Sequence, residues 1–351
     1  MNRLKKLIPI HMRILFPVCL IAFLIVLVLS GIMKNSIEQL DTQQMSKRWS
    51  KDGKVSQISC FFSVNTSINT EYIEEFEHNL ENALKQADIS VESPNANARL
   101  WVDAYSASGK ITVKSNIANI TTDCLGIGGD FFQFHPIPLI SGSYFSGNDL
   151  VQDLCVLDKN AAWKLFGSND VVGQVVYIGD VAHIVTGVVE HEDSDLYQSA
   201  GLDEALIYVS YASLEKYGLS NGMNHYEILM PNPVKGYAKS YVKDNIGIPE
   251  NEMELVENST RFDFLSSIKK IKQLPFRSMN GKAIIYPYWE NVARATEDKI
   301  TVMMFFELLF LSVFVIILTL EISLYWKNKK WTLKSIFVFL RKRKARGRKI
   351  L

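Results

Sequence analysis

Several short motifs in this chain resemble catalytic sequences, and the strongest is a serine between two glycines. Gly218–Gly222 has the G-x-S-x-G pattern of a nucleophilic serine, which requires a strand before it and a helix after it. The flanking residues predict the reverse order, a short helix over Tyr211–Tyr217 and a strand over His225–Met230. His225 is the one histidine downstream of the serine, five residues away, and no credible triad follows. The motif therefore predicts a loop and no catalytic residue.

Nucleotide and metal motifs are also incomplete. Gly126–Gly129 is too short for a dinucleotide fingerprint and predicts turn geometry instead. Gly109-Lys110 and Gly281-Lys282 lack the four-residue spacer and the Ser or Thr of a phosphate loop. The acidic run Glu190–Asp195 predicts a solvated loop, because adjacent ligands give a metal ion poor geometry and the six histidines contain no i, i+4 pair. We therefore expect no enzyme activity, no cofactor and no bound metal.

Charge separates along the chain although the formal net charge is only +1. Residues 1–13 carry four basic side chains and residues 326–351 carry eleven, with no acid in either segment. Subtracting these 15 from the 38 Lys and Arg leaves 23 in residues 14–325, against all 37 Asp and Glu. The two ends are therefore cationic, and the middle is anionic with a net charge of −14.

Two apolar runs account for this separation. Ile14–Met33 has 20 residues without a charge, and Val302–Leu320 has 19 residues with one, so each suffices to cross the hydrocarbon core as a helix. Their basic flanks place both termini in the cytoplasm by the positive-inside rule, and the first run lacks a signal-peptide cleavage site. The sequence thus predicts a two-pass cell-membrane protein with a basic N-terminus (1–13), a transmembrane helix (14–33), an extracytoplasmic domain (34–300), a second transmembrane helix (301–325) and a basic cytoplasmic tail (326–351).

The extracytoplasmic residues repeat a β-α-β pattern. The first copy has a strand over Val55–Val64, a helix after Asn69, and a hairpin of Arg99–Tyr105 and Lys110–Lys114 across Ser106–Gly109. The second has the strand His225–Met230, a helix opened by Pro233, and a strand over Met253–Val256. Two such halves commonly build an antiparallel sheet with helices on one face, which predicts an α+β domain. Asn35–Trp49 predicts a stalk helix, and Tyr288–Lys299 predicts a helix that runs on into the second apolar run.

A turn-rich segment, about residues 140–205, separates the two copies. It contains a strand at Cys155–Leu157, a helix at Lys159–Phe166 closed by Gly167, and a hairpin of Val175–Ile178 with Ala182–Val189 across a Gly-first turn. We interpret it as an inserted small β-rich subdomain. Cys60, Cys124 and Cys155 are odd in number and form no C-x-x-C, so we expect no disulfide framework.

The same segment carries a family resemblance. It contains, in order, Gly142–Phe145, Cys155–Asp158, Ala161–Gly167, Val172–Val176 and Val185–Val189. This series resembles the periplasmic core domain of MacB-type ABC transporter permeases, in which an alanine helix ending in Phe-Gly precedes Gly-x-x-[VI] and a Val-x-Gly-Val strand. The likeness extends over about residues 14–325. It implies a porter-like α+β domain with an inserted β-rich subdomain between two transmembrane helices.

The resemblance also implies a function. It suggests a non-catalytic membrane subunit of an ABC export system that relays motion between membrane helices and the extracytoplasmic domain. The implied partners are an ABC ATPase subunit, a larger permease subunit or both, with an adaptor protein as a further candidate. The family's permeases continue into a coupling helix and two more membrane helices, whereas 26 residues follow Tyr325 here. The alternative is a two-pass receptor with a ligand-binding extracytoplasmic domain and an output supplied by a partner.

The second apolar run contains acids that need a polar environment. Glu307 and Glu321 lie 14 residues apart, roughly four helical turns, so they share one helix face. That face also holds Leu311, Phe314 and Leu318. Because intramembrane acids tend to face protein or water, the face predicts contact with a partner helix. Snorkelling of both carboxylates to the headgroups is the alternative.

The tail combines apolar and basic residues between Trp326 and Leu351. This mixture predicts an interfacial helix that binds anionic lipid at the inner leaflet. An anchor that only fixes the topology is the alternative, and we expect no nucleic-acid binding.

Overall fold

The computed structural model describes residues 10–50, 52–90, 98–202, 205–273 and 282–328. The chain divides into two compact units. We call Ser36–Thr301 the sheet unit. The described residues of Met1–Asn35 and of Val302–Leu351 form the other unit, which we call the helix pair.

Among the described residues of the sheet unit, eleven strands form one sheet. They are β1 (Val55–Phe62), β2 (Val102–Lys114), β3 (Asn119–Gly129), β4 (Leu139–Gly142), β5 (Leu154–Asp158), β6 (Val175–Ile178), β7 (Val181–Val189), β8 (Leu206–Ser210), β9 (Leu219–Ser220), β10 (His225–Pro231) and β11 (Met253–Glu257). The order is β11-β1-β10-β2-β3-β8-β5-β7-β4. Two strands lie off this path: β6 pairs with both β2 and β7, and β9 pairs with β2. The β3–β8 and β5–β7 pairs are parallel and the other pairs are antiparallel.

The helices are mostly short. They are α2 (Ile10–Glu38), α3 (Met45–Trp49), α4 (Thr70–Gln86), α5 (Phe131–Phe134), α6 (Lys159–Phe166), α7 (Asp195–Ser199), α8 (Tyr211–Tyr217), α9 (Tyr237–Asn245), α10 (Phe264–Ile271) and α11 (Tyr288–Asn328), with 3-10 turns η1 (Asp41–Gln43) and η2 (Asn258–Thr260). Helix α11 is the longest, with 41 residues. It begins in the sheet unit and continues in the helix pair.

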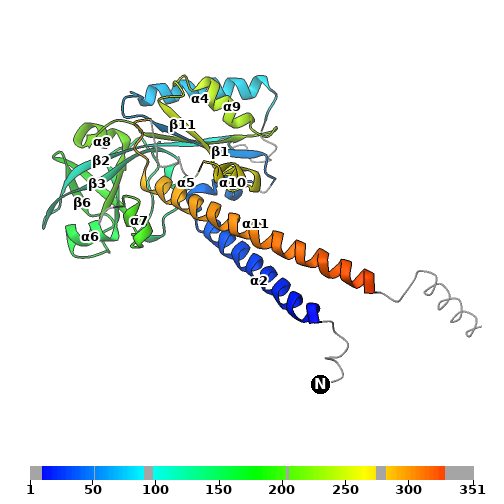
Figure 1. Ribbon diagram of the computed structural model, residues 1–351. Coiled ribbons are helices and arrows are strands. Elements are labelled where there is room, and N and C mark those ends of the chain that lie inside the picture. The colour runs from blue at the N-terminus through cyan, green and yellow to red at the C-terminus, as the bar shows by residue number, and fades with distance from the viewer. Residues whose placement is uncertain (1–9, 51, 91–97, 203–204, 274–281, 329–351) are drawn as a thin grey trace, which may run out of the picture. The chain divides into compact units, whose positions relative to one another are not determined.

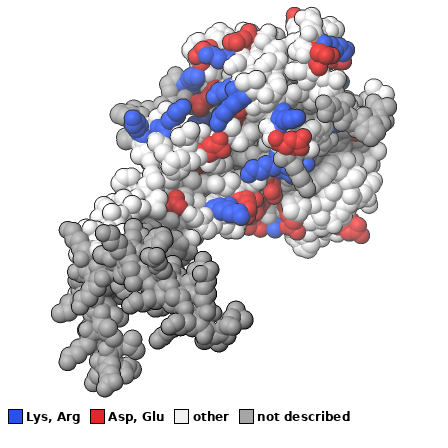
Figure 2. All heavy atoms as spheres, turned by 90° about the vertical axis from the view of Figure 1, so that its right-hand side faces the viewer, with Lys and Arg blue, Asp and Glu red and all other residues white. Residues whose placement is uncertain are grey.

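Strand alternation gives the sheet two different faces. On β10, Tyr226 and Ile228 enter one core cluster, together with the buried stripe of α4 and with α9. Helices α4 and α9 lie side by side over the β1 and β11 end of the sheet (Figure 1). Because side chains alternate along a strand, His225, Glu227 and Leu229 point to the opposite face, where Leu229 joins the second cluster with Phe131. On the visible surface of the sheet unit, charges of both signs are interspersed (Figure 2).

The expected strands β1, β5, β6, β7, β10 and β11 and the helices α4, α6 and α8 are all present. Asn69 caps α4 by accepting from the Tyr72 N–H, and Gly167 closes α6 with a φ of 70°. The β6–β7 turn has positive φ at both Gly179 and Asp180, so both central residues are left-handed. The segment expected as an inserted subdomain supplies β4 to β7, which lie together at one end of the sheet order, apart from the β2 contact of β6.

The hairpin expected across Ser106–Gly109 is wrong, because these residues lie within the continuous strand β2. Gly109 is not a turn residue. A Cβ there would lie 2.5 Å from the Leu219 carbonyl oxygen, so glycine allows β9 to approach β2 closely. The turn expected at Gly126–Gly129 is likewise strand, and a Cβ on Gly128 would lie 2.0 Å from the Tyr105 ring.

Two helix expectations also need correction. The stalk helix expected over Asn35–Trp49 is broken, because α2 ends at Glu38 and α3 starts afresh at Met45. Met45 is buried in the second core cluster, which draws this segment into the sheet unit. Helix α9 begins at Tyr237, after the left-handed Gly236, and not at Pro233.

The helix pair consists of α2 and the second part of α11. The Phe23 and Phe314 rings lie 5.2 Å apart, and the Ser30 hydroxyl donates to the Glu307 carboxylate. Residue numbers rise along one helix as they fall along the other, so the two helices are antiparallel. Both are long and apolar enough to cross a membrane.

Candidate functional site

The first turns of α11 present a row of charged side chains to the sheet unit. Glu290, Arg294 and Glu297 stand at positions i, i+4 and i+7, which places them on one helix face. Glu290 is fully buried and Glu297 is 4% exposed. Buried carboxylates are stable only when cations or several hydrogen-bond donors compensate them. The residues that pack against this face must therefore supply cations or donors for these carboxylates, if the first turns of α11 are to stay buried.

Arg261, which directly follows η2, supplies the central cation. Its two terminal nitrogens contact the two Glu290 oxygens at 2.7 and 2.9 Å, a bidentate pair. The same guanidinium lies 3.4 Å from each Glu297 oxygen. It also donates to the Gln43 side-chain oxygen at 3.2 Å. Arg261 thus joins α11 to η1, the segment that follows α2.

A second cation extends the cluster to the edge of the sheet. Arg294 donates to Glu290 at 2.8 Å and to Glu254 of β11 at 2.6 Å, and its guanidinium lies 3.8 Å from the Tyr286 ring centre. Burial alone raises the pKa of the Glu254 carboxyl, but Arg294 and the Tyr286 hydroxyl bring that pKa below its usual value. Glu254 is therefore an anion at neutral pH.

Lys270 of α10 completes the group by pairing with Glu297 and donating to the Arg261 carbonyl. We call these six residues, Arg261, Arg294, Lys270, Glu254, Glu290 and Glu297, the Arg261 cluster. It has three cations and three carboxylates, so its charge is balanced. Its charged groups are paired with one another, and this geometry suits a mechanical connection between α11 and β11, η1, η2 and α10.

A different group of buried side chains in the sheet unit could hold a metal ion. The ligating atoms of His135, His225 and Glu227 all lie within 4.8 Å of one another, and all three residues are buried. Burial lowers the pKa of His225 to about 4. Burial alone raises the pKa of Glu227, but His135 brings it below its usual value.

The residues expected to face a partner helix lie in the helix pair. Glu307 accepts a hydrogen bond from Ser30 of α2. Phe314, Leu318 and Glu321 line a hollow of about 420 Å³ together with residues of α2. Leu311 does not line this hollow and is 39% exposed. The structure therefore turns most of this face toward the chain's own first helix.

Glu321 differs from Glu307 in its surroundings. Both Glu321 carboxylate oxygens are shielded, and neither has a hydrogen-bond partner among the described residues. The other residues that line its hollow are apolar or aromatic apart from Cys19. An acid in such a place is costly and is usually functional.

The motif fragments occupy structural positions. Ser220 lies in β9, is exposed, and accepts from the Gly222 N–H. Lys110 pairs with Asp123, and Lys282 donates to the Met253 carbonyl, while Gly281 lies outside the described residues. The expected solvated loop at Glu190–Asp195 is only partly correct. His191 is 8% exposed and bonds Asp158 at 2.7 Å, because Asp158 organises this region as the α6 cap.

Sequence reasoning did not single out either buried cluster. The i, i+4, i+7 row on α11 was a usable signal, because an acid-base-acid face at the start of a helix requires partners. His225 and Glu227, two residues apart on a strand, also share a face. Arg261 and His135 gave no local signal, since only the tertiary fold brings them to their partners.

Comparison with known proteins agrees with this architecture. Residues 20–235, well over half of the chain, match the model of the family described as MacB-like periplasmic core domain. The macrolide export ATP-binding/permease protein MacB of Chromobacterium violaceum is 38% identical over 77 residues, which are 21% of this chain and 12% of that protein. The MacB of Haemophilus ducreyi is 34% identical over 91 residues, 25% of this chain and 13% of that protein. The matched segments thus span about an eighth of these relatives' length.

Solved structures are similar as well. The periplasmic region of MacB from Actinobacillus actinomycetemcomitans aligns with 58% of this chain and 89% of its own, at 14% identity and a TM-score of 0.38. The extracellular domain of the noncanonic ABC-type transporter YknZ aligns with 57% and 99%, at 19% identity and a TM-score of 0.36. On its family match, the chain belongs to the MacB-like periplasmic core domain family: it is a membrane protein of the ABC transporter permease type, with an extracytoplasmic domain between two apolar helices.

Proposed function

We propose that this chain is a non-catalytic subunit of a MacB-like export system that relays motion between membrane helices and the extracytoplasmic domain. The observation that carries the proposal is the Arg261 cluster. It binds the first turns of α11 to β11, η2 and α10, and through Gln43 to the segment that follows α2. A displacement of α11 would therefore reach the sheet through buried ion pairs. No chemical step within the chain is needed.

The membrane topology of this proposal has both termini in the cytoplasm, with spans at 14–33 and 301–325. The antiparallel packing of α2 and α11 supports it, because two antiparallel spans place their connected ends on one side of a bilayer. Residues 1–9 and 329–351, which contain most of the basic flanks, lie outside the described residues. Binding of the tail to anionic lipid stays a prediction.

The energy for such a motion would come from partners, namely an ABC ATPase subunit, a larger permease subunit, or both, with an adaptor protein on the outer side. The macrolide-exporting relatives support this class of assembly by their names. Contact with a partner helix is proposed for the face of Glu307, Leu311, Phe314, Leu318 and Glu321. Glu321 is its best-supported member, because the described residues give its carboxylate no partner.

Relay can be tested with a fluorescent label on the extracytoplasmic domain. Lys85 of α4 is exposed, and the four native cysteines are buried, so a Lys85→Cys chain takes a thiol label at one position. In membranes from the native host, ATP should change the label's signal. Arg261→Met should remove that response, whereas Arg99→Met, at a bidentate Arg–Asp pair outside the cluster, should leave it intact.

The outcomes separate the alternatives. A response that survives Arg261→Met would reject relay through this cluster. A wild-type label that ignores ATP, in a chain that crosslinks to no membrane partner, would reject the subunit proposal and favour the receptor alternative. Purification in mild detergent should recover an ATPase or permease, and Glu321→Leu should weaken that recovery more than Thr319→Leu, an exposed position nearby.

A further inference from the structure

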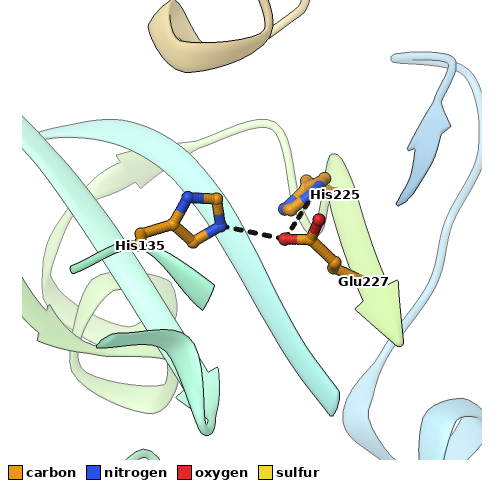
Figure 3. A group of neighbouring side chains, drawn as sticks. All are labelled: His135, His225 and Glu227. Atoms are coloured by element: carbon orange, nitrogen blue, oxygen red, sulfur yellow. Dashed lines mark ion pairs between the residues drawn. The ribbon is translucent and has the colours of Figure 1, made fainter. Parts of the chain in front are cut away.

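Two imidazoles and one carboxylate converge inside the sheet unit, on the face opposite α4 and α9. His225 and Glu227 project from the same side of β10, and His135 directly follows α5. The distances to one Glu227 oxygen, Oε2, are 3.0 Å from His135 Nε2 and 3.9 Å from His225 Nε2. Figure 3 shows both rings turned toward that oxygen. In a tetrahedral zinc site with bonds of about 2.0–2.1 Å, neighbouring ligand atoms lie roughly 3.3 Å apart, which these distances bracket.

The rest of the Glu227 side chain is held firmly. Its other oxygen, Oε1, accepts from Gln57 at 2.7 Å, from Ser59 at 2.6 Å and from Asn258 at 3.2 Å. Three neutral donors thus orient the carboxylate so that Oε2 faces the histidines. Such outer partners are typical of a metal-ligating carboxylate, whose direction they fix. On the other side, His225 Nδ1 lies 3.3 Å from the Ser106 hydroxyl, which leaves Nε2 for a ligand.

Among the described residues, the converging atoms have no hydrogen-bond partner outside their own group. Glu227 Oε2, His225 Nε2 and both ring nitrogens of His135 bond no other side chain there, and the only contacts of Oε2 are the two imidazoles. The three residues are at most 2% exposed. A buried polar atom without a partner destabilises the fold, so several of them aimed at one point call for a shared ligand.

We propose that His135, His225 and Glu227 form a buried binding site for a divalent transition-metal ion. The donor set of two nitrogens and one oxygen suits zinc and its neighbours and does not suit magnesium or calcium, which prefer oxygen ligands. The proposal rests on this geometry alone and is independent of the function proposed for the Arg261 cluster.

The position of the site indicates a structural role. Trp289, in the first turn of α11, packs against both imidazoles, with ring centres 4.6 Å from His135 and 5.5 Å from His225. Phe131 stacks on His135 and Phe61 stacks on His225. These aromatic rings restrict space for a substrate near the ion. A metal here would fix β10 to the end of α5, directly beneath the start of α11.

An ion can approach the site from one side. His135 lines a hollow of about 440 Å³ that is also lined by Asp41, Asp158, Glu190 and Glu192. Carboxylates around an opening raise the local concentration of cations. Of the three ligands only His135 borders this hollow, so an ion would enter past its ring, and a metal site requires such a path.

The test uses the full chain in detergent, purified through a tag without histidine, stripped with a chelator and desalted. Titration with Zn²⁺ should show about one tight site per chain, and Co²⁺ should give the visible absorption of a tetrahedral complex. Glu227→Gln and His135→Gln should remove the cobalt spectrum. Ser59→Ala, which changes a positioning residue, should weaken zinc affinity roughly 10–100-fold.

His191→Gln is the matched control, because His191 is also buried and also bonded to a carboxylate, that of Asp158. The His191→Gln variant should bind Zn²⁺ and Co²⁺ as the wild-type chain does. Circular dichroism of each metal-free variant shows whether it folds. If Glu227→Gln, the substitution in β10, prevents folding, the test uses His135→Gln instead. A folded wild-type chain without a tight site would overturn the proposal. So would cobalt binding that survives in His135→Gln or falls equally in His191→Gln.

Discussion

Adjacent residues of α11 contact two buried polar clusters that solve the same physical problem differently. Glu290 belongs to the Arg261 cluster, in which three cations offset three carboxylates. Trp289 covers the group of His135, His225 and Glu227, which we call the His225 cluster, where one carboxylate faces two imidazoles. Both clusters lie within the sheet unit.

The difference shows what burial demands of charge. The Arg261 cluster is complete, because every carboxylate in it contacts a permanent cation at short range. Among the described residues, the His225 cluster has no such cation in contact, so Glu227 depends on neutral donors, on the two imidazoles and, in our proposal, on a bound metal. One cluster is therefore suited to transmitting force, and the other to responding to a ligand.

The largest effect should come from breaking the complete cluster. Arg261→Met leaves Glu290 and Glu297 buried with only their remaining cations, and should lower the free energy of unfolding by about 3–5 kcal/mol. Arg99→Met is the control, since Arg99 forms a bidentate pair with Asp130 but its side chain is about half exposed, so the loss should be under about 1 kcal/mol. Urea unfolding of the full chain in detergent, followed by tryptophan fluorescence, measures both. Equal losses would show that burial of the Arg261 pairs adds no stability.

A smaller change in the free energy of unfolding should distinguish the two clusters when one buried glutamate in each is replaced by glutamine. In metal-free protein, Glu290→Gln should cost about 2–3 kcal/mol, because Arg261 and Arg294 lose a shared carboxylate. Glu227→Gln should change stability by less than about 1 kcal/mol, because the amide oxygen can keep the three donors to Oε1 and the amide nitrogen can face the imidazole nitrogens. The same urea measurement applies. A larger loss from Glu227→Gln would mean that the carboxylate itself already stabilises the metal-free cluster.

The spacing of apolar residues along the sequence predicted those helices and strands whose formation depends on neighbouring residues in the chain. The stripe of Ile73, Phe76, Leu80 and Leu84 fixes α4, and each of these side chains is buried. Strand β2 was missed at Gly109, because the reason for that glycine is a neighbouring strand 110 residues away in the chain, at Leu219. A glycine in a strand and a glycine in a turn look identical until the pairing is known.

The sites follow the same division. Strand spacing places His225 and Glu227 on one face, and helix spacing aligns Glu290 with Arg294 and Glu297. The other members come from elsewhere in the chain: His135 and Arg261 follow short helices, Glu254 lies in β11 and Lys270 in α10. Sequence spacing can therefore identify two of the three residues of the His225 cluster and three of the six of the Arg261 cluster, and the tertiary fold supplies the rest.

A third way of burying a carboxyl appears on the opposite face of the sheet. Glu77 of α4 is hydrogen-bonded to Asp103 of β2, and the Tyr226 hydroxyl donates to Asp103 at 3.0 Å. Burial, together with the hydrogen bond to Asp103, raises the pKa of Glu77 to about 9. The Glu77–Asp103 pair therefore differs from both clusters in how its negative charge is compensated. A proton does so in this pair, whereas Arg or His side chains contact the carboxylates of the clusters.

The smallest effect should be a pH dependence that this proton produces. Between the ordinary carboxyl pKa of 4.5 and the folded value of about 9, folded protein keeps a proton that unfolded protein has released. The contribution to stability is thus complete below pH 4.5 and is lost as pH rises through the folded pKa. Because Glu77 is partly exposed, solvent screening should narrow the pH window in which the slope approaches the single-proton limit of about 1.4 kcal/mol per pH unit. Urea unfolding at several pH values should show Glu77→Gln with a flatter profile than wild type, and Glu75→Gln, at an exposed position on the same helix, with an unchanged one. If the Glu77→Gln profile falls as steeply as wild type, Glu77 does not carry that proton, and Asp103, whose pKa burial also raises, is the group that holds it.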